Sequence, residues 1–65
     1  MTGEEIKALR LRLGLTQTEL GDVIGVYWGT VSRWEAGKMM PSTLALRALA
    51  ELDRKRSRIQ KKQKE

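Results

Sequence analysis

Residues 15–37 of this 65-residue chain read LTQTELGDVIGVYWGTVSRWEAG, and this stretch decides the fold. Thr16 and Glu19 have the spacing of a capping box, in which the threonine hydroxyl and the glutamate carboxylate bind free amides at a helix start. Gly25 and Gly37 follow two apolar patterns with helical spacing, and a residue that tolerates positive φ commonly ends a helix there. The stretch therefore predicts two short helices separated by a turn at Gly25.

Both short helices are predicted to bury one side against a core. The second should run from about residue 27 to residue 35, where Val31 and Trp34 are three positions apart and face inward. Helices of about two turns are not stable alone, so packing must hold them. In the first helix, the side chains predicted to be buried are Leu20, Val23 and Ile24.

Further helices are predicted on either side of this stretch. Thr2 and Glu5 form another capping-box pattern, and Gly14 is placed to end the helix that follows. Its predicted buried stripe is Ile6, Leu9 and Leu13. Ser42 can cap a last helix, in which leucine and alanine occur nearly all round, so the pattern leaves its buried face open. No glycine or proline follows Pro41, so nothing stops this helix, and the chain is predicted to be all-α.

The composition excludes most enzyme chemistry. The chain has no cysteine and no histidine, which removes disulfides, thiolate nucleophiles, imidazole bases and nearly every zinc site. The carboxylates are spread over helices and a loop and do not form an acid–base pair. We therefore expect no catalytic site, no metal and no cofactor. The acidic N-terminus is unlike a signal peptide and no apolar run could span a membrane, so we expect a cytoplasmic protein.

The positive charge is concentrated at the end of the chain. Residues 1–52 carry six cations and six anions, whereas residues 53–65 carry seven cations and two anions and account for the net charge of +5. We therefore divide the chain into a domain, residues 1–52, and a basic, helical C-terminal tail, residues 53–65. The tail suits a polyanionic partner, but charge alone fits a solubilising role equally well. Ile59 is its only large apolar residue, which is too little to anchor a helix in a membrane.

The spacing of apolar residues and glycines resembles that of the lambda-repressor/Cro-like (XRE) family of helix-turn-helix DNA-binding domains. The matching positions are Leu20, Gly21, Ile24, Gly25, Val26, Val31 and Trp34, and the segments 15–17 and 30–38 match as well. The resemblance covers residues 1 to about 52. It implies a compact domain of four helices, possibly five, in which the helix at 27–35 lies in the major groove and the preceding helix crosses the backbone. Gly21 is expected where these two helices cross and approach closely.

The resemblance also implies which residues contact DNA. Arg33 is expected on the outward face of the reading helix, where an arginine can bind guanine O6 and N7 or contact only phosphate. Gln17 is expected to meet a phosphate, the alternative being an ordinary first-turn residue. Thr30 could likewise bond a phosphate or its own backbone. The full expected set is Gln17, Tyr27, Trp28, Gly29, Thr30, Ser32, Arg33 and Lys38.

Several positions depart from the family pattern, among them Met39 and Met40, which replace a loop that is often basic. Trp28 and Gly29 stand where polar base-reading residues are usual, and Tyr27 replaces a short polar residue that could cap the helix. The Trp28 ring could press on thymine methyl groups, or it could fold onto the protein's own surface. Gly29 either allows a close approach to DNA or weakens the helix by about 1 kcal/mol relative to alanine.

The resemblance implies one further pair and a function. Arg10 and Glu35 are expected to form an ion pair that clasps the fold without touching DNA. The implied function is that of a transcriptional repressor that binds a palindromic operator as a homodimer, with half-sites about one helical turn apart. The alternative is an antitoxin-like module that binds a protein partner through a hydrophobic surface. The residues of that surface would be Tyr27, Trp28, Met39 and Met40.

Overall fold

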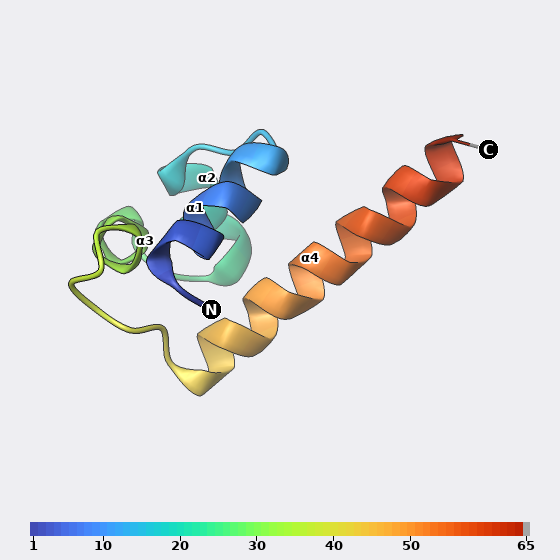
Figure 1. Ribbon diagram of the computed structural model, residues 1–65. Helices are drawn as coiled ribbons and strands as arrows, with labels where there is room; N and C mark the ends of the chain where they lie inside the picture. Colours follow the sequence, from blue (N-terminus) through green and yellow to red (C-terminus); the bar gives the residue numbers. More distant parts are fainter. Residues whose placement is uncertain (65) are drawn as a thin grey trace.

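The computed structural model describes the backbone of residues 1–64 and the side chains of residues 1–55. The described chain forms four α-helices and no strand, and Figure 1 shows the first three gathered beside the first half of the fourth. The all-α prediction is confirmed, and the possible fifth helix is absent from the described residues. The helices are α1 (Gly3–Arg12), α2 (Gln17–Ile24), α3 (Trp28–Glu35) and α4 (Thr43–Lys64).

Both predicted capping boxes are present at the starts of α1 and α2. The Glu5 amide donates to Thr2 Oγ1 over 3.1 Å, and the Thr2 amide donates to Glu5 Oε1 over 2.7 Å. Thr16 and Glu19 exchange equivalent bonds of 3.0 and 2.8 Å. The bonds from Thr2 favour the ionised carboxylate and lower the pKa of Glu5. Local side-chain chemistry therefore fixes where the first two helices begin.

The turn between α2 and α3 depends on two glycines. Gly25 has a φ of +91° and ends α2 in the left-handed conformation. The amides of Gly25 and Val26 both donate to the Gly21 carbonyl, over 2.7 and 2.8 Å. A Cβ on Gly21 would lie 2.6 Å from the Val26 carbonyl oxygen. Gly21 therefore leaves room for the turn that folds back over α2, and a Cβ there would also lie 3.5 Å from the Trp28 amide nitrogen at the start of α3.

The core lies between all four helices. Most of the side chains that the sequence predicted to be buried belong to it. Figure 1 shows α1, α2 and α3 around a common centre, and Val31 and Trp34 hold α3 to it. The prediction for Val23 was wrong, because its side chain is 57% exposed. The buried arc of α2 passes through Leu20, Gly21 and Ile24, and at 100° per residue Val23 falls outside it. The buried residues are Ile6, Leu9, Leu13, Leu20, Val31, Trp34, Ala45 and Leu49.

Helix α4 buries one stripe near its start and then leaves the globule. Ser42 accepts a hydrogen bond from the Ala45 amide over 3.2 Å, as its predicted capping role requires. Ala45 and Leu49 settle the face that the sequence left open, and an ion pair joins Arg12 at the end of α1 to Asp53. Figure 1 shows the second half of α4 extending away from α3, without a break between residues 52 and 53. The side chains of the tail from residue 56 onward lie outside the described residues.

Candidate nucleic-acid interface

The outward face of α3 is the surface on which the expected base-reading residues meet. Val31 and Trp34 are buried on the inner side of this helix. On the outer side Arg33 is exposed and Ser32 is half-buried, while Trp28 is 47% exposed at the first turn. The inner side chains thus fix the helix, and the outer ones are free to meet a ligand.

An aromatic pair stands at the N-terminal end of this face. Tyr27 is the N-cap residue of α3, but its side chain makes no capping hydrogen bond, as expected for a tyrosine. The first helical residue is Trp28. The Tyr27 ring is 67% exposed and lies 5.4 Å from that of Trp28, centroid to centroid, at an angle of 44°. Tilted rings at this separation attract each other beyond the area that they bury. We call Tyr27 and Trp28 the aromatic pair.

Gly29 has a structural role that the sequence did not reveal. A Cβ at this position would lie 2.9 Å from Tyr27 Cε2, which real Cβ atoms essentially never show, and 3.0 Å from Tyr27 Cδ2. The ring of the preceding N-cap residue therefore occupies the space that a side chain at 29 would need. The glycine allows the aromatic pair to form, whatever it also allows toward DNA.

At the other end of α3, Glu35 is the centre of a buried polar network. It accepts hydrogen bonds from Arg10 Nε over 2.7 Å and from Arg10 Nη2 over 3.1 Å. Arg10 Nη1 also donates to the Leu15 carbonyl over 3.0 Å. The Arg10 and Glu35 side chains are 12% and 6% exposed, and the bonds to Glu35 raise the pKa of Arg10 against the opposing effect of burial. The pair that the sequence singled out thus ties α1 and the α1–α2 loop to the end of α3.

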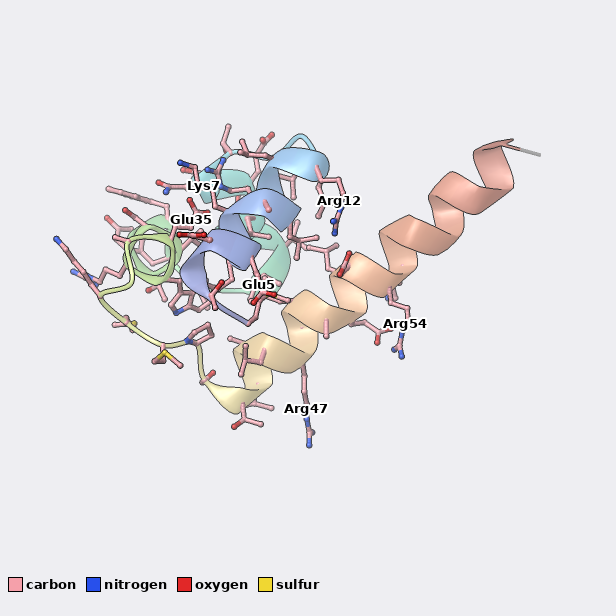
Figure 2. The ribbon with its side chains drawn as sticks, viewed as in Figure 1. Glu5, Lys7, Arg12, Glu35, Arg47 and Arg54 are labelled. Atoms are coloured by element: carbon pink, nitrogen blue, oxygen red, sulfur yellow. The ribbon has the colours of Figure 1, made fainter. Side chains whose placement is uncertain are left out.

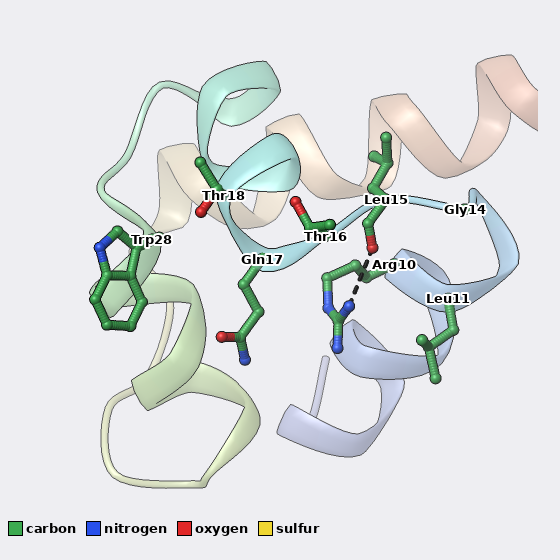
Figure 3. Close-up of a pocket in the computed structure, with 8 residues that line it drawn as sticks. All are labelled: Arg10, Leu11, Gly14, Leu15, Thr16, Gln17, Thr18 and Trp28. Carbon is green, nitrogen blue, oxygen red and sulfur yellow. Dashed lines mark hydrogen bonds between the residues drawn. The ribbon is translucent and has the colours of Figure 1, made fainter.

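Gln17 also bonds to Glu35, a contact that the sequence analysis did not predict. Its Nε2 donates to Glu35 Oε1 over 3.2 Å. The side-chain amide nitrogen of glutamine has two hydrogens, so one remains for an outside acceptor such as a phosphate oxygen. Figure 3 shows Gln17 in an open pocket that also contains the Trp28 indole and the start of α2. The structure thereby brings the first residues of α2 and α3 to one surface.

The remaining expected residues lie around α3. Thr30 is half-buried within the helix, and Lys38 is exposed just after it, where its amide donates to the Arg33 carbonyl over 2.9 Å. Met39 and Met40 are exposed in the loop before α4. The methionines thus follow the C-terminal end of α3, whereas the aromatic pair is at its N-terminal end. Figure 2 shows Arg47 and Arg54 pointing from α4 away from the other helices.

Other kinds of site find little support in the described part of the chain. Residues 1–55 hold no cluster of acidic side chains, histidines or cysteines that could bind a metal ion. Among the described helices, none combines the length and the apolar composition that crossing a membrane requires.

Comparison with known proteins identifies the family. The model of the helix-turn-helix family matches residues 6–58, which include the whole of α2, the turn and α3. The chain belongs to this family, in its XRE-type branch. The helix-turn-helix is a DNA-binding domain and not a catalytic one.

Two kinds of curated protein are similar to parts of this helix-turn-helix chain. The Type II methyltransferase M1.ScrFI of Lactococcus lactis subsp. cremoris is 44% identical over 74% of this chain and 14% of its own length. The Mycobacterial cidal antitoxin MbcA of Mycobacterium tuberculosis is 44% identical over 63% of this chain and 36% of its own length. The chain therefore spans well under half of either relative. No solved structure matches it significantly.

Proposed function

We propose that this chain is a transcriptional repressor that recognises a specific double-stranded DNA sequence by placing α3 in the major groove. The observation that carries the proposal is the exposed Arg33 on the outer face of a helix whose inner face is locked by Val31 and Trp34. An arginine so placed can donate two hydrogen bonds to guanine O6 and N7. Gln17, held by Glu35, supplies a phosphate contact that fixes the position of the helix.

The size of α3 supports binding by two copies. Its eight residues span about 12 Å, which is roughly a third of one duplex turn, so one copy reads only a few base pairs. Two copies on half-sites about one turn apart would read twice as many and would require a palindromic site. The repressor is therefore proposed to act as a homodimer on its operator.

Selection of bound duplexes from a random pool, with the full chain, tests this proposal. The expected result is a palindrome with one guanine per half-site whose replacement weakens binding to the wild-type protein but not to Arg33→Ala. The salt dependence of binding should show several phosphate contacts per site. Recovery of unrelated duplexes, or no mobility shift even at low salt, would contradict the proposal.

A second candidate function is binding of a protein partner. The similarity to an antitoxin and the exposed Tyr27, Trp28, Met39 and Met40 favour it. Because these side chains lie at opposite ends of α3, a partner would have to cover that helix and would compete with DNA. If this function holds, replacing Met40 with alanine should weaken partner binding while leaving DNA binding unchanged.

A further inference from the structure

The outer face of α3 offers only a few kinds of chemistry. Trp28 has a large apolar ring with a single N–H donor, Gly29 has no side chain, Ser32 has a hydroxyl and Arg33 has a guanidinium group. In the major groove, guanine presents acceptors that suit arginine, while thymine alone presents a methyl group among the four bases. The N-terminal half of this face therefore presents mainly the apolar surface of the Trp28 ring.

We propose that the Trp28 indole reads the 5-methyl group of a thymine in the major groove, and that Tyr27 and Gly29 position it for this contact. The inference rests on the proposed DNA-binding function and adds a base preference to it. Trp28 is the specificity-determining residue, and its two neighbours act through it.

The surroundings of Trp28 favour this reading over simple packing on the protein. Nearly half of its side chain remains exposed, although burial of an aromatic ring is strongly favourable. The Tyr27 ring lies 5.4 Å from the Trp28 ring, centroid to centroid, and Figure 3 shows Trp28 lining the same open pocket as Gln17. The indole is thus held at the edge of the surface from which Gln17 would meet a phosphate.

Gly29 contributes in two ways to the same arrangement. It has no Cβ, which would lie only 2.9 Å from Tyr27 Cε2, so the Tyr27 ring can pack beside Trp28 at the helix start. It also places no competing hydrogen-bonding group beside the indole. Both effects favour contact through the apolar face of the indole, which suits a methyl group.

The positions of the two readers give a spacing for the site. Trp28 and Arg33 are five residues apart, which is about 7.5 Å along a helix, or roughly two base-pair steps. We therefore expect the thymine about two to three base pairs from the guanine that Arg33 contacts.

Replacement of thymine by deoxyuridine in the selected duplex tests the inference, because it removes only the methyl group. One such replacement should weaken binding of the wild-type chain by about fourfold, the effect of one buried methyl-sized group. Trp28→Ala should bind the thymine and uracil duplexes equally. Met40→Ala, which alters an exposed apolar side chain beyond the other end of α3, should keep the wild-type ratio.

The outcomes separate this inference from the proposed function. Specific binding with no loss at any uracil, or an equal loss in wild type and Trp28→Ala, would overturn the reading by Trp28 and leave the repressor proposal intact. Failure to bind any duplex at low salt would overturn both. Thermal melting of each variant shows whether it is folded. If Trp28→Ala is unfolded, Trp28→Phe serves in its place and should retain part of the loss of affinity at uracil.

Discussion

The two ends of α3 are held by different chemistry. At the C-terminal end, Glu35 accepts three hydrogen bonds from Arg10 and Gln17 and is almost inaccessible. At the N-terminal end, Tyr27 and Trp28 restrain each other while about half or more of each side chain stays exposed. Removing the partner of a buried charge strongly lowers the free energy of unfolding, whereas an exposed ring has surface left for a ligand. One end therefore anchors the proposed reading helix, and the other keeps exposed surface for the proposed contact with DNA.

The largest effect is expected from breaking the anchored end. Glu35→Ala leaves the Arg10 guanidinium buried without its partner and should lower the free energy of unfolding by about 3–5 kcal/mol. Arg10→Ala should also destabilise the chain, and the double variant should cost less than the sum of the two. Urea unfolding measures all three.

An exposed ion pair provides the control for this cycle. Glu51 pairs with Arg54 on the surface of α4, so Glu51→Ala should lower the unfolding free energy by no more than about 1 kcal/mol. Additive losses for Arg10→Ala and Glu35→Ala would mean that burial of the pair does not couple the two residues, and the contrast between the ends of α3 would fail.

A smaller effect is expected from the outward face next to the anchored end. Arg33→Ala should weaken binding to the preferred site by about 1–3 kcal/mol and relax the preference at one base pair per half-site, because a bidentate guanine contact is lost. Titrations on the preferred site and on single-base variants measure this. An equal loss on every duplex would show that Arg33 contacts only phosphate.

A change of about 1 kcal/mol is expected at the aromatic end. Gly29→Ala should improve helix propensity by about that amount, but only when the Tyr27 ring is absent. In the Tyr27→Ala background the alanine at 29 should therefore stabilise the chain, while in the wild type the crowded ring cancels the gain. Urea melts of the four proteins measure the difference, and equal gains in both backgrounds would refute the packing of Tyr27 over Gly29.

The smallest effect on DNA binding is expected from the tail. Figure 1 shows the backbone of the second half of α4 leading away from α3, and hence away from the proposed reading surface. Removing residues 56–65 should change the slope of log affinity against log salt by less than about 0.9, the effect of one phosphate contact. A decrease of several units would show that the tail reaches the same duplex.

Local signals in the sequence predicted the parts of the fold that depend on neighbouring residues. The capping boxes at Thr2 and Thr16 set helix starts through bonds that span three residues, and they occur as expected. The spacing of Val31 and Trp34 identified the inner side of α3 for the same reason. The outward position of Arg33 followed directly from that assignment.

Most features that depend on the relative placement of whole helices were not predictable, and the Arg10–Glu35 pair was expected only from the family resemblance. The sequence gives no reason for Gln17 to reach Glu35, or for Arg12 to reach Asp53, because these contacts require the final packing of α2 on α3 and of α1 on α4. Val23 was misassigned since a two-turn helix presents too few apolar positions to define the centre of its buried arc. The crowding at Gly29 could not be predicted, because it depends on the side-chain rotamer of Tyr27.

Protection of guanine N7 from dimethyl sulfate on the selected operator tests the central claim most directly, since N7 lies in the major groove. With α3 in the groove of each half-site, the wild-type chain should protect two guanines about one helical turn apart, and Arg33→Ala should protect neither at the same occupancy. Full occupancy of the operator without N7 protection would contradict the account, because the chain would then bind DNA by a surface other than the outward face of α3.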